Sequence, residues 1–152
     1  MILAVIGGTP EQHVDLYMQL CQAISNDYEV RHVKLSAHNG ERGAVKIKQA
    51  LLVKYGDTVT LITGVSSVKQ IAVFSACRVP PVFCVMPGPL PPRLINAVEF
   101  KKDWLFVAPT PSELETPEKQ RRYCTITEAF SECFARKREF FLSKGRSNRA
   151  GS

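Results

Sequence analysis

The run Ile2-Leu-Ala-Val-Ile6, closed by Gly7-Gly8 and followed by Thr9-Pro10, decides the fold class of this chain. A continuous apolar run bounded by glycine is typical of a strand buried on both faces, as in a parallel sheet. Thr9 suits the N-cap of a helix and Pro10 its first position, so the sequence predicts a helix from here to about Ile24.

A second unit of the same kind lies near the middle of the chain. The β-branched run Thr58–Thr63 ends at Gly64, and Ser66-Ser67 can cap a helix that reaches Cys77. Further elements alternate around these two units. They are strands at Tyr28–Leu35 and Val82–Met86 and a helix over Ala44–Lys54. Strict alternation favours right-handed crossovers and a largely parallel central sheet flanked by helices, which is an α/β fold.

The C-terminal third predicts additions to this sheet. Leu94–Phe100 and Trp104–Val107 are interpreted as an antiparallel hairpin at one edge. An amphipathic helix then opens at Thr116 or Glu118, with apolar residues at helical spacing as far as Phe141. We therefore divide the chain into a ligand-binding domain over residues 1–110, a helical segment over 111–143, and a basic tail over 144–152 that we expect to be disordered.

The composition favours a globular domain over a membrane-spanning protein. The 152 residues are 45% hydrophobic and 22% charged, as in a globular domain, and no apolar run approaches the roughly 18 residues of a membrane span. The apolar start is too short for a signal peptide, so we expect a cytoplasmic protein without membrane contact. The five cysteines form no metal-binding pattern, so we predict free thiols, no metal and no cofactor.

Positive charge concentrates in the C-terminal segment. From Pro117 onward nine Lys and Arg face four Glu, which gives +5, whereas the preceding residues carry eleven against ten, which gives +1. Such a segment can contact nucleic acid, and a solvated helix face explains the charge equally well.

Two glycine-bearing loops are the candidate ligand site. In an open α/β sheet, ligands bind beyond the carboxyl ends of strands, where helix N-termini offer free amides to anions. The loops Gly7–Pro10 and Thr63–Ser67 both follow such strands, and Lys69 adds a charge in the next helical turn. Each loop alone is also explained as a tight turn with a cap. Their placement at corresponding strand ends favours a shared site.

The segment Asp57–Ala76 resembles the strand, Thr-Gly loop and helix of CARF domains, the CRISPR-associated Rossmann-like sensors of cyclic oligoadenylates. Leu3–Pro10 is similar to the first strand and turn of that family. Two positions depart from the family pattern. Val65 stands where a second glycine is usual, and Ser67 stands where a basic residue is usual, with Lys69 following two positions later.

The resemblance implies a Rossmann-like homodimer that binds a cyclic oligoadenylate across its two-fold axis in antiviral defence. It implies these ligand-binding residues: Gly8, Thr9, Pro10, Thr63, Gly64, Ser66, Ser67 and Lys69. Some members of the family also cleave their ligand as metal-independent ring nucleases, and Ser67 and Lys69 are the candidate catalytic residues here. Binding without cleavage is an equal alternative, since the sequence shows no evident general base.

Other functions stay open. Arg121-Arg122 and Arg136–Arg138, with Tyr123 to stack on a base, suit a nucleic-acid-binding or structural module of a defence or regulatory complex. A small α/β enzyme acting on a phosphorylated metabolite is the third alternative. His13 is interpreted as a surface residue, with an acid–base role over the first loop as the alternative. The usual dinucleotide and Walker motifs are absent from the sequence.

Overall fold

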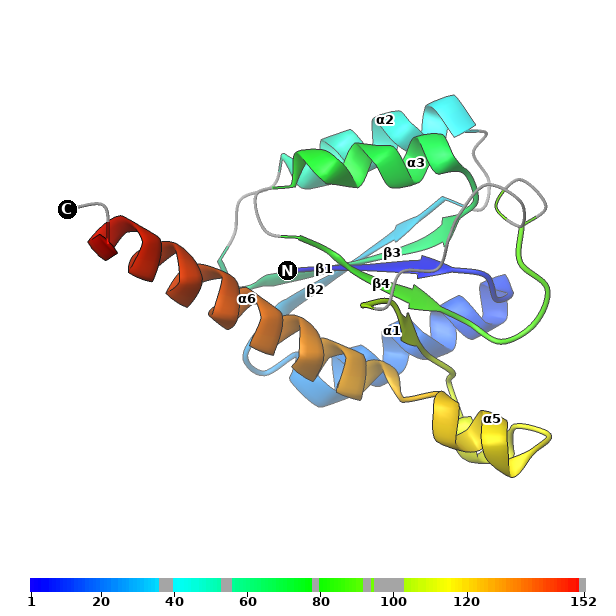
Figure 1. Ribbon diagram of the computed structural model, residues 1–152. Coiled ribbons are helices and arrows are strands. Elements are labelled where there is room, and N and C mark those ends of the chain that lie inside the picture. The colour runs from blue at the N-terminus through cyan, green and yellow to red at the C-terminus, as the bar shows by residue number, and fades with distance from the viewer. Residues whose placement is uncertain (36–39, 53–55, 78–79, 92–93, 95–102, 151–152) are drawn as a thin grey trace.

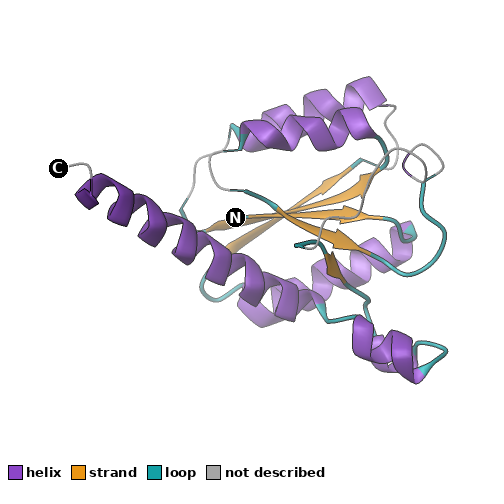
Figure 2. Ribbon diagram, in the orientation of Figure 1, coloured by secondary structure: helices purple, strands orange, loops and turns teal. Residues whose placement is uncertain are grey.

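The computed structural model describes residues 1–35, 40–52, 56–77, 80–91, 94 and 103–150, and these form an α/β fold with a parallel sheet between two layers of helices (Figures 1 and 2). The sheet has five strands in the order β2-β3-β1-β4-β5, and all four pairings are parallel. The strands are β1 (Ile2–Ile6), β2 (Glu29–Lys34), β3 (Thr58–Val65), β4 (Val82–Val85) and β5 (Leu105–Phe106). The predicted fold class is confirmed.

Helices cover both faces of the sheet because its central strands are apolar on both sides. Helices α1 (Pro10–Ile24) and α6 (Ile126–Ala150) lie on one face, and α2 (Gly40–Leu51) and α3 (Val68–Val73) lie on the other (Figure 1). In β1, Leu3 and Val5 join the core on the α1 face, whereas Ala4 and Ile6 join the core on the α2 face. This explains why the strand is a continuous apolar run.

The chain leaves neighbouring strands β1 and β3 toward opposite faces. From β1 it turns to α1, and from β3 it turns to α3, on the other side of the sheet. The two strands run in register, with Val5 opposite Thr63 and Ile6 opposite Val65 across a local irregularity. Their carboxyl ends therefore flank a point where the direction of winding reverses, which is where open α/β sheets bind ligands.

The C-terminal edge differs from the predicted hairpin. Strand β5 lies at the sheet edge as expected, but it pairs in parallel with β4, through Cys84 opposite Leu105 and Val85 opposite Phe106. Leu94 is helical rather than extended, and residues 95–102, the rest of the predicted partner strand, lie outside the described residues. Alternating apolar residues show that a strand exists, but they do not show the direction in which it runs.

The predicted C-terminal helix is split in two. Helix α5 (Pro117–Arg122) ends where Tyr123 becomes extended, and Cys124 then forms a parallel bridge with Val107. The amide of Cys124 donates to the Phe106 carbonyl at 2.8 Å, and Thr125 caps α6 by accepting from the Glu128 amide. Contact with the sheet edge therefore keeps residues 123–125 out of the helix, although the spacing of the apolar residues alone fits one continuous helix.

Helix α6 belongs to the main core. Ile126, Ala129 and Cys133 pack in the same buried cluster as Leu16 and Leu20 of α1, so the segment 111–143 is built onto the sheet. The helix continues to Ala150, where we expected disorder from residue 144; residues 151–152 lie outside the described part. A single glycine inside a helix costs about 1 kcal/mol, which does not stop a helix by itself.

The described helices include none that is long and apolar enough to cross a membrane.

Candidate functional site

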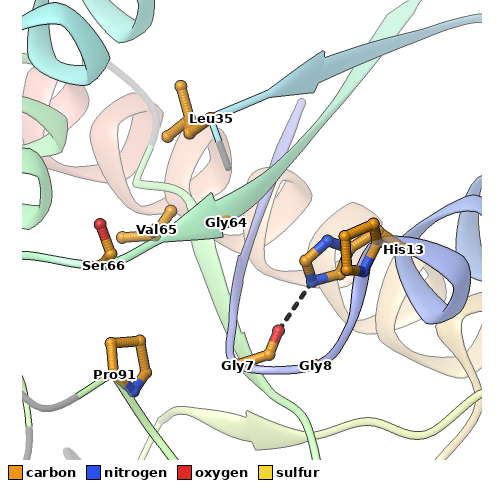
Figure 3. A pocket seen from close by; sticks show the side chains of 9 residues that line it. Gly7, Gly8, His13, Leu35, Gly64, Val65, Ser66 and Pro91 are labelled. Carbon is orange, nitrogen blue, oxygen red and sulfur yellow. Dashed lines mark hydrogen bonds between the residues drawn. The ribbon is translucent and has the colours of Figure 1, made fainter. Parts of the chain in front are cut away.

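A crevice opens at the carboxyl end of the sheet, between the loops that follow β1 and β3 (Figure 3). Its volume is about 190 Å³. Its wall includes residues of β3 and residues of the loops that follow β1, β2, β3 and β4. The lining residues are Gly7, Gly8, Pro10, His13, Leu35, Gly64, Val65, Ser66 and Pro91. The two predicted loops therefore meet, although they lie more than fifty residues apart in sequence.

Glycines shape both walls of this crevice. Gly7, Gly8 and Gly64 have φ angles of +81°, +84° and +82°, in the left-handed region that side chains disfavour. At Gly8 a Cβ atom would also collide with the Met86 sulfur and lie 3.2 Å from His13 Nε2. The main chain at the crevice therefore stays bare, and a ligand can approach its amides closely.

Thr9 and Pro10 form the start of α1 as the sequence predicts. The Gln12 amide donates to Thr9 Oγ1 at 3.2 Å, and the Thr9 amide donates to Gln12 Oε1 at 2.9 Å, which is a full capping box. Pro10 carries no amide hydrogen. The Glu11 amide is therefore the first-turn amide that the capping box does not use, and it lies in the positive field at the start of α1.

The β3–α3 loop places Ser66 and Ser67 in different roles. Ser67 is buried and caps α3, accepting from the Gln70 amide at 3.2 Å. Ser66 lines the crevice, and its amide donates to Gln70 Oε1 at 2.8 Å. Of the predicted ligand-binding residues, Gly8, Pro10, Gly64 and Ser66 line the crevice, whereas Thr9 and Ser67 cap the helices beside it.

Two predicted site residues lie away from the crevice. The Thr63 side chain is buried and shares a 2.8 Å hydrogen bond with Nε2 of His32, which stacks on Tyr17 of α1. The Lys69 ammonium is exposed, pairs with Glu41 at 3.5 Å, and lines a separate groove between α2 and α3. The register of α3 thus turns Lys69, a predicted ligand-binding residue, away from the crevice lining.

His13 is a crevice residue, which corrects its interpretation as a surface side chain. It is only 4% exposed, and its Nε2 lies 2.8 Å from the Gly7 carbonyl oxygen (Figure 3). Helical side chains lean toward the N-terminus, so a residue one turn after the cap reaches back over the preceding loop. This tilt of helical side chains is the feature from which the position of His13 could have been predicted.

Gln70 also belongs to the site, although no sequence pattern predicts its role there. Its side chain is fully buried, and its Oε1 accepts a hydrogen bond from the Ser66 amide. Its Nε2 has no hydrogen-bond partner among the residues that the structure describes. A Cβ atom at Gly43 of α2 would overlap that Nε2. Gln70 therefore wedges between α2 and the β3–α3 loop and fixes the backbone at the crevice wall.

Burial shifts the pKa of cysteine and histidine side chains outside the crevice lining. All five cysteines are free, and burial raises the pKa of the Cys84 and Cys133 thiols, which disfavours the nucleophilic thiolate. Burial, together with Lys34 and His13, lowers the pKa of His32 to about 4, so its ring is neutral at pH 7. Within the described ranges, no cluster of three or more His, Cys, Asp or Glu side chains could hold a metal ion.

The predicted nucleic-acid cluster is partly occupied by internal contacts. The Arg122 guanidinium lies 4.1 Å from the centre of the Phe106 ring, and Tyr123 packs edge-on against the same ring. Arg136 pairs with Glu132 at 3.0 Å. Tyr123 therefore packs against the sheet edge through one side of its ring.

Comparison of the chain with protein-family models, with curated proteins and with solved structures finds no match in any of the three.

Proposed function

We propose that this chain is a CARF-like sensor that binds a cyclic oligoadenylate in the crevice between β1 and β3, as a homodimer in CRISPR antiviral defence. The observation that carries the proposal is the meeting of the two glycine turns at one reversal point of a parallel sheet. The resemblance of Leu3–Pro10 and Asp57–Ala76 to the CARF family supplies the ligand class.

The chemistry of the crevice suits a phosphate and its ribose. Positive-φ glycines expose main chain to the ligand, and the fifteen-residue helix α1 directs its positive end there. The Ser66 hydroxyl donates to Gln70 Oε1 at 3.4 Å, and its oxygen can accept a hydrogen bond from a ribose hydroxyl. Among the described residues that line the crevice none is Lys or Arg, so recognition relies on neutral donors and the helix field.

The size of the crevice supports a shared site. Its volume of about 190 Å³ is below the roughly 300–1,000 Å³ of typical small-molecule pockets. A cyclic oligonucleotide has repeated nucleotides, so two crevices related by a two-fold axis can each hold part of one ring. We therefore expect one ligand per two chains.

Calorimetry and thermal unfolding with cyclic tri-, tetra- and hexa-adenylate test this function, with linear tetra-adenylate as the control ligand. A ligand at 100 times its Kd stabilises the folded state by about 2.7 kcal/mol. For a domain of this size that raises the Tm by about 5–10 °C. We expect such a shift for one ring size, with a stoichiometry of one ring per protein dimer.

A matched pair of variants locates the binding. Ser66→Asp places a carboxylate in the crevice and should abolish the shift by repelling phosphate. Ser131→Asp makes the same change on the exposed face of α6 and should leave the shift intact. If none of the rings stabilises the wild-type protein, the proposal is wrong, and the crevice would next be tested with phosphorylated metabolites.

A second candidate function, binding of nucleic acid, is favoured by the shape of α6. The C-terminal part of this basic helix extends beyond the amino ends of the strands (Figure 1). Its binding should fall steeply with salt, because each phosphate contact releases a counterion. Binding in the crevice, which lacks cationic lining in its described part, should change little between 50 and 200 mM salt, so a salt titration separates the two functions.

A further inference from the structure

We infer that His13 is the general base of the crevice and that the chain cleaves the ring it binds. The inference rests on the proposed function for its substrate class, and it assigns the chemistry to a residue other than Ser67 and Lys69. It starts from the 2.8 Å contact between His13 Nε2 and the Gly7 carbonyl oxygen.

That contact fixes which nitrogen of the ring is basic. A carbonyl oxygen can only accept, so Nε2 must carry the hydrogen and donate it to Gly7. In the neutral ring the lone pair then resides on Nδ1. Within the described part of the chain, Nδ1 has no hydrogen-bond partner, and the ring forms part of the crevice wall. The arrangement holds one proton acceptor ready at the site.

The position of the ring is also well defined. His13 is buried on α1, and its bond to Gly7 ties the helix to the turn that precedes it. Figure 3 shows the imidazole over the Gly7–Gly8 turn, with Gly64 and Ser66 across the crevice. A ligand seated against both turns therefore lies beside the ring, which is the proximity that proton transfer requires.

Ser67 and Lys69, the catalytic candidates that the resemblance implies, lack this placement. Ser67 Oγ accepts from the Gln70 amide and is buried as a helix cap. Lys69 is turned to the outer groove and pairs with Glu41. Among the described residues that line the crevice, His13 has the one titratable side chain.

The reaction needs no co-reactant. Nδ1 takes the proton of a ribose 2′-hydroxyl, and the 2′-oxygen forms a bond to the phosphorus of the adjacent 3′-phosphate. The bond from phosphorus to the 5′-oxygen of the next nucleotide breaks, and that oxygen takes up the proton held by the imidazolium. The product is a linear chain with a 2′,3′-cyclic phosphate and a free 5′-hydroxyl. Main-chain amides of the two turns stabilise the charge that develops on the phosphate oxygens.

The substitution His13→Gln tests the role while keeping the structural bond. The Gln amide can still donate from Nε2 to the Gly7 carbonyl, but it cannot act as a base. We expect the affinity for the ring to change by less than about tenfold and single-turnover cleavage to slow by about 100-fold or more, the usual contribution of a general base. His32→Gln is the matched control, because that ring lies outside the crevice lining, and cleavage there should match the wild type.

Binding and cleavage are measured separately, by calorimetry and by chromatography of the products. If the wild type binds no ring, the proposed function fails. If it binds a ring and leaves it intact, or if His13→Gln cleaves at the wild-type rate, the role of His13 is overturned while the binding function stands. Should His13→Gln melt below the assay temperature, His13→Asn, a smaller side chain, is measured against the same two outcomes.

Discussion

At the scale of single residues, the glycine turn after β1 sets what the crevice can accept. Gly7 and Gly8 have positive φ angles and lie next to Met86 and His13. The turn therefore has no side chains of its own but packs closely against its neighbours. Side chains at such positions are strained in themselves, by about 1–2 kcal/mol. At Gly8 the neighbouring sulfur adds a collision to that strain.

Gly8→Ala is therefore expected to destabilise the protein by about 2–4 kcal/mol, the sum of backbone strain and overpacking. Gly88→Ala is the matched control, because Gly88 also has a positive φ, of +106°, but its Cβ would meet nothing within 4 Å. Urea unfolding should show the larger loss for Gly8→Ala. Equal losses would mean that Met86 moves aside freely and that the turn is not tightly packed.

His32 makes stability depend on pH. Its pKa is about 4 in the folded protein and about 6.5 in an unfolded chain, because the ring is desolvated beside Lys34 and His13. Between these values the unfolded chain binds a proton that the folded protein does not bind. The stability is therefore fully present above pH 6.5 and falls as the pH drops toward 4.

The expected loss is on the order of 1 kcal/mol, since the half-buried ring is partly screened by water. Urea unfolding at a series of pH values between 4 and 7 measures it. His32→Gln should show a shallower pH dependence than the wild type over this range. The same slope in both proteins would show that His32 titrates alike in the folded and unfolded states.

At the scale of elements, the wedge of Gln70 between α2 and the β3–α3 loop couples a helix to the crevice. We expect Gly43→Ala to destabilise the protein by about 1–3 kcal/mol, because the new methyl group displaces the buried Gln70 amide from the Ser66 amide. In a Gln70→Ala background the same substitution should cost less, and the double-mutant cycle measures the difference.

Gly56→Ala is the control for this cycle, since a Cβ atom there meets nothing within 4 Å. It should leave stability within about 0.5 kcal/mol of the wild type. If Gly43→Ala costs the same with and without Gln70, the side chain does not transmit contact from α2 to the loop.

Local signals predicted most of the elements, and non-local contacts explain the differences. The runs of β1 and β3 end in glycines that the turns require, and the capping residues Thr9 and Ser67 occupy the predicted positions. The bridge from Cys124 to Val107 divides α5 from α6, and it depends on a contact between distant elements that helical periodicity does not contain. The parallel direction of β5 is likewise set by the path of the chain.

The candidate site was predictable where it depends on main chain and less so where it depends on side-chain direction. Gly8, Gly64 and Ser66 follow strands whose adjacency the alternating pattern implied. Thr63 and Lys69 stand close to them in sequence, but strand alternation and helix register turn both side chains elsewhere. The role of Gln70 depends on its packing against α2, and the local sequence pattern does not contain that information.

At the scale of the whole molecule, two helical layers cover the faces of one parallel sheet, and the crevice opens at the carboxyl edge of that sheet. Helices α1 and α3 leave that edge on opposite faces, and the crevice lies between their starting turns (Figure 1). Helix α6 lies on the α1 face and carries much of the basic charge away from this edge. Ligand binding and any contact of α6 with nucleic acid therefore use separate parts of the surface.

Hydrogen–deuterium exchange with and without the stabilising cyclic oligoadenylate tests most directly where the ligand binds. We expect slower exchange in peptides that cover Gly7–Gln12 and Gly64–Gln70, because their amides would contact the bound ring or lie beneath it. Exchange in peptides from α6 should not change. Protection confined to α5 and α6, or absent from both turns despite a measured affinity, would contradict the placement of the site between β1 and β3.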